Sequence, residues 1–585
     1  MGLLLLVAAA VYVPWTSHEF IWDDFVQITE NPAVRRGVPL GQYFTDRETT
    51  STRSDYNERI YRPLRSMFFR GIWVASAISP THRALFFLGL NVVLYLLGGL
   101  LVYALCRRFT EDDLASLIGA GMWLLVPVHG EDVLYASALG DLASLDFQLA
   151  GLWMAFSAID SERPAWGRGL GSMVLFLLAT LTKEMAITSG PLLFIYVVSE
   201  RRSAWAPSRR MATLFVVGGH LVCTIVYLFL RVRLLGRVGQ EAVQLIETLW
   251  AVADSPWLLL QYAKLSLMPF GHAPDYGSAA PIVRITAIYA VVGLSLFAWL
   301  NVRGSRGVRY GAWLYVVSLA PVLHLVPLWT LMADRFALVP SVGLALIFAG
   351  LATRAQERQR PLLIGVSVLL AVMWAGASAV EARRFRSDES LFAYGIEEVP
   401  TSGLAHHNLG LTLLKKGEID RAIEHLTLAD KLGRRDPRMY HHLAGALEAK
   451  GRLDEAARAI AIAIRLQPDY GKAYAQRSAI ERRQGNLDAA ERSLAESLRH
   501  DVPQRIYDRE RAALFVARGQ IDEARALYRA MAQTDEPDPL LWQHAAECAE
   551  VLGDFDEARD AAERCLKIDP TRAPCLALRA RHAPQ

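Results

Sequence analysis

The sequence predicts an all-α protein: a polytopic transmembrane helical bundle of about eleven spans, followed by an α-solenoid. Two observations predict this fold. Up to about residue 381 the 585-residue chain repeats long apolar runs separated by short basic or turn-rich breaks, and from about Arg383 onward it becomes rich in Ala, Arg, Glu and Leu. The later part also repeats glycine and alanine at an interval of 34 residues, which is typical of stacked helical hairpins.

The apolar runs are long enough to form membrane spans, since a helix needs roughly 20 apolar residues to cross the hydrocarbon core. One such run could be a core helix, but eleven indicate a membrane bundle. The first run lacks a basic segment before it and a convincing cleavage site after it, so we expect a retained span and not a signal peptide. The runs lie near residues 2–17, 85–105, 114–128, 133–158, 169–182, 185–199, 211–230, 282–302, 310–327, 336–352 and 361–381.

Lysine and arginine collect in alternate breaks, and the positive-inside bias places those breaks in the cytoplasm. This predicts a cytoplasmic N-terminus and an exterior C-terminus. Residues 257–270 then form an outer interfacial or re-entrant segment, because counting them as a span would place the Arg-rich loop 303–309 outside. The breaks predicted to face outward are 18–84, 129–132, 183–184, 231–281 and 328–335.

The 34-residue period predicts five tetratricopeptide repeats over residues 401–585, after a membrane domain over 1–382 and a linker over 383–400. A glycine ends the first helix of each hairpin, and small residues allow the second helix to approach closely. We expect the solenoid to bind extended peptide and to carry no chemistry of its own. The glycines are Gly417, Gly451, Gly485, Gly519 and Gly553; the alanines five residues later are Ala422, Ala456, Ala490, Ala524 and Ala558; the small residues seven earlier are Gly410, Ala444, Ser478, Ala512 and Ala546.

Charge and cysteine content exclude some partners and indicate others. The formal net charge is +3, and no stretch of Lys and Arg is dense enough to indicate nucleic-acid binding. The five cysteines form no CxxC pair, so we expect buried small side chains and not metal ligands or disulfides. They are Cys106, Cys223, Cys548, Cys565 and Cys575.

Ionisable side chains gather in the breaks predicted to face outward. Ionisable groups near span ends are costly and are usually paired or functional. Their concentration on one membrane face indicates a single polar site, while the alternative is a set of structural ion pairs and solvated loop ends. The residues are Asp23, Asp24, Arg62, His129, Glu131, Asp141, Lys183, Glu184, Asp334 and Arg335.

Five motifs in order resemble those of the transmembrane and tetratricopeptide-repeat-containing protein O-mannosyltransferases, a family of type C glycosyltransferases. They are WDDFVQITENP, YRPL, PVHGEDV with GDLAS, TKEMAIT and DRFALVPS. That family also places its membrane part before its repeats, so the resemblance spans nearly the whole chain. One departure is GDLAS, which stands where the family commonly has Gly-Arg-Ala-Asp.

Topology and resemblance together predict the chemistry. Nucleotide sugars are cytoplasmic, so a sugar transferase facing outward needs a donor delivered by the membrane, such as a polyprenyl- or dolichyl-phosphate-linked sugar. A carboxylate base must accept the proton of the attacking hydroxyl. The resemblance implies Asp23 as that base with Asp24 beside it, and we expect one base and not a dyad. Arg62, Lys183 and Arg335 are expected to bind the donor phosphate.

The remaining polar residues are expected to orient donor or acceptor: His129, Glu131, Asp141 and Glu184. No cofactor is required by any spacing, although a divalent cation is compatible with these ligand types. The resulting hypothesis is an inverting membrane glycosyltransferase that moves a sugar, expected to be mannose, to a protein Ser/Thr hydroxyl, with the repeats recruiting the acceptor.

Two other classes stay open at this point. One is a non-catalytic, membrane-anchored tetratricopeptide scaffold for an envelope complex, and the other is a transporter or polysaccharide polymerase. The expected location is a bacterial inner membrane with the active site and repeats in the periplasm, or the luminal side of the endoplasmic reticulum if the source is eukaryotic.

Overall fold

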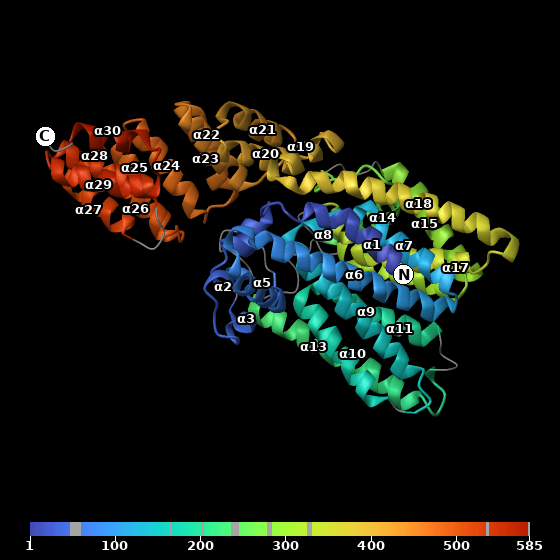
Figure 1. Ribbon diagram of the computed structural model, residues 1–585. Coiled ribbons are helices and arrows are strands. Elements are labelled where there is room, and N and C mark those ends of the chain that lie inside the picture. Colours follow the sequence, from blue (N-terminus) through green and yellow to red (C-terminus); the bar gives the residue numbers. More distant parts are fainter. Residues whose placement is uncertain are drawn as a thin grey trace. The chain divides into compact units, whose positions relative to one another are not determined.

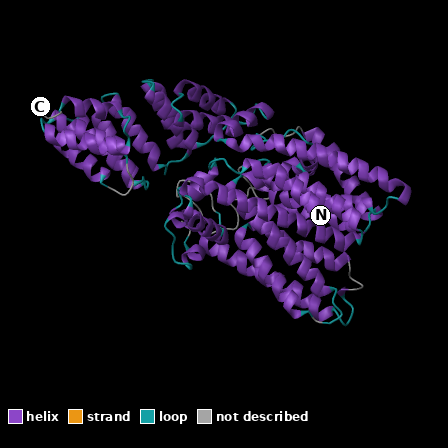
Figure 2. Cartoon of the chain, in the orientation of Figure 1, coloured by secondary structure: helices purple, strands orange, loops and turns teal. Residues whose placement is uncertain are grey.

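The computed structural model (Figure 1) describes residues 1–46, 49, 60–163, 165–199, 204–235, 245–277, 283–324, 330–533 and 538–582. Every regular element in these ranges is a helix (Figure 2), so the predicted all-α class is confirmed. Internal contacts divide the chain into two compact units, Met1–Ala405 and His406–Gln585. The predicted linker 383–400 is largely helical and lies in the first unit, in η11 (Ala382–Arg386) and α19 (Asp388–Glu398).

Each of the eleven predicted runs overlaps a helix of the first unit. Their apolar sequences favour helices because, away from water, backbone polar groups must be satisfied within the segment. They are α1 (Gly2–Tyr12), α6 (Arg83–Thr110), α7 (Asp113–Leu125), α9 (Leu139–Ile159), α10 (Trp166–Thr182), α11 (Ser189–Ser199), α13 (Arg210–Leu235), α15 (Val283–Arg303), α16 (Arg306–Leu319), α17 (Leu338–Ala352) and α18 (Arg360–Glu381).

Fewer than eleven of the described helices are long and apolar enough for a full membrane span. In the described ranges, five are long and apolar enough to cross a membrane, or six if α7 and the bent segment after it count as one. Four shorter apolar helices, of 10–17 residues, accompany them. These helices indicate a membrane protein, while the count of eleven spans stays a prediction.

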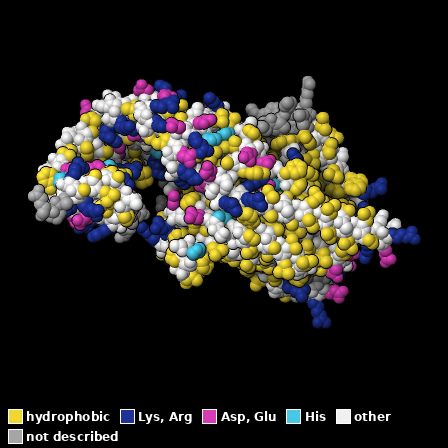
Figure 3. All heavy atoms as spheres, turned by 45° about the horizontal axis from the view of Figure 1, so that its top comes forward, with side chains coloured by type: hydrophobic (Ala, Val, Ile, Leu, Met, Phe, Trp, Pro, Cys, Tyr) yellow, Lys and Arg dark blue, Asp and Glu magenta, His cyan; other side chains and the backbone are white. Residues whose placement is uncertain are grey.

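The outer surface of the first unit is apolar, as lipid contact requires. Large side chains such as Val93 on α6, Leu294 on α15 and Val372 on α18 are 59%, 66% and 66% exposed. Figure 3 shows apolar side chains covering most of the visible surface of this unit. A patch of this kind on a soluble monomer would be unusual, and here it marks the face that meets acyl chains.

The breaks between the helices are joined by ion pairs in two separate groups. Among the breaks predicted to be cytoplasmic, Arg108 pairs with Asp160 at 2.5 Å and Arg360 with Asp112 at 3.4 Å. The breaks predicted to face outward are joined by separate ion pairs, described with the site below. Which end faces the cytoplasm stays a prediction.

Short helices build the end of the bundle that holds the predicted site residues. The segment 257–270, predicted to be interfacial or re-entrant, lies largely within the longer helix α14 (Leu245–Leu267). Residues 47–48, 50–59, 236–244, 278–281 and 328–329 of the predicted outward breaks lie outside the described residues. The elements are η1 (Val13–Trp15), η2 (Phe25–Thr29), α2 (Pro32–Arg35), α3 (Gln42–Thr45), α5 (Pro63–Ala75), η3 (Ser76–Ile78), η4 (Pro80–His82), η5 (Pro127–His129), α8 (Gly130–Leu134), η6 (Ala136–Ala138), η7 (Glu184–Thr188), η8 (Ala320–Val322) and η9 (Asp334–Ala337), with η10 (Glu357–Gln359) between α17 and α18.

The second unit consists of helical hairpins with the predicted period, so the repeat prediction is confirmed. The five periodic glycines each follow the first helix of a hairpin with a positive φ, 76–83°, which glycine adopts at little cost. The five periodic alanines are fully buried. The helices are α20 (Gly403–Lys415), α21 (Ile419–Lys431), α22 (Pro437–Ala449), α23 (Leu453–Leu466), α24 (Gly471–Arg483), α25 (Leu487–Arg499), α26 (Gln504–Ala517), α27 (Ile521–Ala532), α28 (Pro539–Val551), α29 (Phe555–Ile568) and α30 (Ala573–Arg581).

Close helix packing explains the small residue in each first helix. A Cβ at Gly410 would lie 2.8 Å from the Leu426 side chain and 3.3 Å from the Ala422 carbonyl oxygen. The corresponding Ala444, Ser478, Ala512 and Ala546 are fully buried. The sequence period therefore reflects the crossing point of the two helices in every hairpin.

One cysteine prediction is wrong. Cys565 on α29 and Cys575 on α30 form a disulfide, whereas we expected both to be unpaired small side chains. Cys565 does occupy a buried small-residue position, and the start of α30 brings the second sulfur within bonding distance. Only ten residues separate the two, and their spacing alone gave no sign of pairing.

A buried histidine pair in the first two hairpins predicts acid sensitivity of this unit. His407 Nδ1 accepts a hydrogen bond from Arg434 at 3.3 Å, and its Nε2 lies 3.2 Å from His442 Nδ1. Burial lowers the pKa of His407 to about 3, and Arg434 acts in the same direction. The ordinary pKa of histidine is about 6.5, so between pH 6.5 and pH 3 the unfolded chain binds a proton at His407 that the folded unit does not. The contribution of neutral His407 to stability is therefore complete above pH 6.5 and falls as the pH drops toward 3.

Hydrogen exchange in the full-length protein measures this effect. Amides of α20 and α22 should exchange faster at pH 4.5 than at pH 7, after correction for intrinsic rates, while those of α28 change less. His407→Gln, which cannot titrate, should reduce the difference. Equal protection of α20 at both pH values would contradict the prediction.

Candidate functional site

Six of the nine predicted site residues form three ion pairs, and each pair joins a predicted phosphate-binding cation to a predicted orienting carboxylate. Arg62 binds Glu184 through two bonds, from Nε at 2.7 Å and from Nη2 at 2.6 Å. Lys183 pairs with Asp141. Arg335 Nη1 lies 2.5 Å from Glu131 Oε1 and its backbone N–H donates to Oε2 at 3.1 Å.

Breaks in the helices place these pairs. Pro127 begins a new turn after α7 because proline cannot continue a helix, and the chain bends by 50° into α8, which carries Glu131. Lys183 is extended directly after α10, with φ −151° and ψ 130°. Arg335 lies in the short helix η9 before α17. Each charged side chain thus lies at the end of an apolar helix.

The carboxylate of Asp24 is held within the structure. It is fully buried and accepts hydrogen bonds from the Ile21 N–H at 3.2 Å, the Ser137 N–H at 2.8 Å and the Ser137 hydroxyl. Burial raises the pKa of Asp24 to about 7, and the Ser137 hydrogen bond opposes this. Asp24 therefore ties the segment after α1 to the segment before α9.

Asp23 occupies a different environment from its neighbour. Its side chain is half-buried, and its backbone N–H donates to the Tyr135 hydroxyl at 3.0 Å. The preceding residue, Trp22, has φ +48°, a conformation that few non-glycine residues adopt. The two adjacent acids thus differ in burial, while the assignment of one base stays a prediction.

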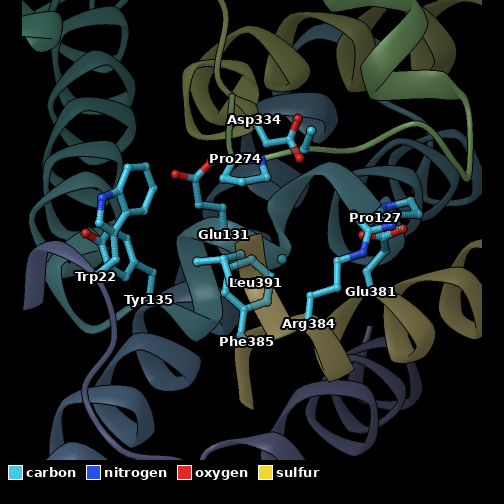
Figure 4. Close-up of a pocket in the computed structure, with 12 residues that line it drawn as sticks. Trp22, Pro127, Glu131, Tyr135, Pro274, Asp334, Glu381, Arg384, Phe385 and Leu391 are labelled. Atoms are coloured by element: carbon cyan, nitrogen blue, oxygen red, sulfur yellow. Dashed lines mark hydrogen bonds and ion pairs between the residues drawn. The ribbon is translucent and has the colours of Figure 1, made fainter. Parts of the chain in front are cut away.

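Two pockets lie beside these pairs. The first, shown in Figure 4, has Trp22 and Tyr135 on one side, Glu381 and Arg384 on the other, and Glu131 and Asp334 between. Its remaining walls are apolar and come from Pro127, Gly130, Ala273, Pro274, Phe385 and Leu391.

The second pocket contains Asp141, Lys183 and Arg335, and is otherwise lined by small polar and apolar side chains. Gln148 and Thr188 are joined there by a hydrogen bond of 3.2 Å. Asp141, Ser144 and Gln148 follow one another at three- and four-residue intervals, so they share one face of α9. The Glu131–Arg335 ion pair contributes one residue to each pocket.

His129 does not join the other predicted residues. It is fully buried, with Nδ1 3.0 Å from the Tyr95 hydroxyl and Nε2 2.9 Å from the Ser341 hydroxyl, and its ring packs on Trp123. It lines neither pocket. In this structure His129 links α6, η5 and α17.

Sequence reasoning missed several charged residues of the site. His272 Nδ1 lies 3.5 Å from Asp334, which also accepts a hydrogen bond from the Tyr276 hydroxyl. Burial acts to lower the pKa of His272, but the Asp334 carboxylate outweighs it and the pKa is raised. Both His272 and Tyr276 belong to a predicted outward break, and that placement was a signal that could have found them.

Asp132 is a second omission. It is fully buried, and its two carboxylate oxygens accept no hydrogen bond from the described residues. Its motif was recognised, but nothing in the sequence distinguished it from Glu131. Over the same ranges, no group of three or more His, Cys, Asp and Glu side chains is arranged to hold a metal ion.

Fold and site together define a class: a multi-helix membrane protein with a buried, ion-paired polar site at one end of its bundle, joined to tetratricopeptide repeats. Sequence comparison finds relatives named as protein O-mannosyl-transferases. One from Caenorhabditis elegans is 23% identical over 71% of this chain and 60% of its own length. Human protein O-mannosyl-transferase TMTC4 is 23% identical over 70% of this chain and 63% of its own length. The predicted resemblance to this family is confirmed.

The chain spans about 60% of the length of these curated relatives. Family models described as tetratricopeptide repeat match residues 407–471, 441–507, 480–539 and 515–581. Among solved structures, a thermophilic TPR protein of Thermus thermophilus is 23% identical, covering 31% of this chain and 97% of that one, with a TM-score of 0.28. A tetratricopeptide repeat protein of Parabacteroides merdae is 16% identical, covering 39% and 83%, with a TM-score of 0.29.

Proposed function

We propose that the protein is an inverting membrane glycosyltransferase that moves mannose from a polyprenyl- or dolichyl-phosphate donor to a Ser/Thr hydroxyl of a protein. The observation that carries this proposal is the site itself: a half-buried Asp23 whose neighbour Trp22 lines the first pocket, and a second pocket that holds Lys183 and Arg335 among apolar helices. The names of the relatives support the same reaction class.

The second pocket suits the donor phosphate. Lys183 and Arg335 contribute two cations to it against one carboxylate, Asp141. Arg335 carries five N–H donors and directs Nη1 at Glu131, so other guanidinium donors can bind phosphate oxygens. The apolar helices beside the pocket suit the lipid chain, because acyl and polyprenyl groups gain nothing from water contact.

Asp23 would act as the base. As the hydroxyl oxygen attacks the anomeric carbon, its proton passes to the Asp23 carboxylate, and the bond from that carbon to the phosphate oxygen breaks with its electron pair on the leaving lipid phosphate. Attack on one face with departure from the other inverts the anomeric configuration. Arg335 and Lys183 stabilise the charge that develops on the phosphate.

Transfer of label from a lipid donor tests the proposal. Purified full-length protein should move radiolabel from polyprenyl-phosphate mannose to synthetic peptides that contain Ser or Thr, and not to matched Ala peptides. Parallel assays with polyprenyl-phosphate glucose and galactose establish which sugar the protein transfers. Absence of transfer from every lipid-phosphate sugar would overturn the proposal and favour a non-catalytic scaffold.

The expected location of site and repeats is outside the cytoplasm. The Cys565–Cys575 disulfide supports this, since disulfides persist in oxidising compartments. A reporter active only outside the cytoplasm should be active when fused after Arg581 and silent when inserted at Gly304. The reverse pattern would place both on the cytoplasmic side and remove the argument for a lipid-linked donor.

A further inference from the structure

The first pocket differs from the second in charge. Its charged lining consists of three carboxylates, Glu131, Asp334 and Glu381, and one cation, Arg384. The second pocket has two cations and one carboxylate. Arg384, the one cation of the first pocket's lining, is already paired with Glu381, so this pocket offers an anionic phosphate fewer cations than the second, and its apolar walls suit a neutral group better.

The Glu131–Arg335 ion pair joins the linings of the two pockets. Glu131 lines the first pocket and Arg335 the second, and 2.5 Å separates Glu131 Oε1 from Arg335 Nη1. The Arg335 guanidinium also lies 5.8 Å from the centre of the Trp22 ring, which lines the first pocket. Groups bound in the two pockets would meet near this pair.

The wall of the first pocket nearest Asp23 is held in a strained conformation. Trp22 has φ +48°, and its backbone N–H donates to Asp388 Oδ1 at 2.7 Å. Its ring stacks on Tyr135 at 5.8 Å and meets the edge of Phe392 at 5.6 Å. Strain of this kind persists only where neighbouring groups impose it, and such residues gather at binding sites.

We propose that the first pocket binds the acceptor polypeptide, with an apolar side chain next to the target Ser/Thr packed between Trp22, Tyr135 and Phe385. The segment that carries Phe385 and Asp388, predicted to be a linker, is then part of the substrate site. Asp388 is a positioning residue, because it acts through Trp22. This inference rests on the proposed function and deepens it.

A methyl group added at Gly130 provides the sharpest test. Gly130 lines the pocket, and the heavy atom nearest to an added Cβ would be Phe385 Cε2 at 3.6 Å, an ordinary contact. Gly130→Ala should therefore fold normally while filling part of the pocket. We expect the KM for a synthetic peptide with one threonine between valine and leucine to rise about tenfold, the KM for the lipid donor changing less than about twofold. Gly71→Ala on α5, where a Cβ meets open space, is the matched control and should change neither.

Variants at Asp388 test the wall independently. Asp388→Ala removes the acceptor for the Trp22 backbone N–H and should raise the peptide KM. Asp388→Asn keeps a side-chain oxygen that can accept this bond, so its peptide KM should lie close to that of the unaltered protein. Direct titration of the same peptide, followed by Trp fluorescence, should show the same order without turnover.

The outcomes separate this inference from the proposed function. A raised donor KM with unchanged peptide KM in Gly130→Ala would assign the first pocket to the donor. Unchanged values for both substrates in Gly130→Ala and Asp388→Ala would leave the pocket without a substrate role. Either result overturns the inference while transfer by the unaltered protein stands, whereas absence of transfer by the unaltered protein overturns the function itself.

Discussion

Asp23→Asn should reduce sugar transfer by at least about 10²-fold, because an amide has the shape of the carboxylate but cannot accept the hydroxyl proton. Insertion into the membrane and thermal stability should stay close to those of the unaltered protein, since the Asp23 side chain is only half-buried. Initial rates with labelled donor and a threonine peptide measure the effect.

Asp24→Asn is the informative comparison. Its new amide N–H₂ must face either the Ile21 N–H or the Ser137 donors, so one buried hydrogen bond is lost at a cost of roughly 1–3 kcal/mol. We expect a lower Tm and a moderate loss of transfer that follows the loss of folded protein. Near-normal turnover in Asp23→Asn and in the double variant would remove the assignment of the base.

Arg335→Met should have the second large effect, on stability as well as on donor binding. It leaves Glu131, whose side chain is 5% exposed, as an unpaired buried carboxylate, and breaking a buried pair in this way typically costs about 3–5 kcal/mol. The measurements are Tm in detergent and KM for the lipid donor.

A double variant separates the two effects. Glu131→Gln with Arg335→Met removes both charges and should recover most of the lost Tm, but donor KM should remain raised at least about tenfold because the phosphate still lacks its cation. Recovery of both stability and donor KM would show that Arg335 serves only to neutralise Glu131.

The sequence predicted the helices and the gathering of charges, and could not predict how the charges pair. Apolar runs and the 34-residue period depend on local patterns, so both appear directly as helices. Whether Arg335 meets Glu131 or Asp141 depends on the packing of helices about 200 residues apart in the chain, which no spacing encodes. His129 illustrates the limit: its place in a polar motif suggested the site, but its partners Tyr95 and Ser341 lie on other helices.

The packing of the segment predicted to be a linker could not be anticipated for a related reason. Residues 383–400 follow the last apolar run and look like a change of composition, but Phe385, Leu391 and Phe392 are buried. Their contribution becomes visible only when Trp22, more than 360 residues earlier, is placed against them.

The three ion pairs also bear on product release. Because Arg62, Lys183 and Arg335 each already have a carboxylate partner, none of these cations depends on the donor for neutralisation. In the proposed reaction, these pairs would close again when the lipid phosphate departs, which costs less free energy than exposing unpaired cations in a dry site. If the proposed donor is used, this arrangement favours rapid release of the spent carrier lipid to the membrane over its tight retention.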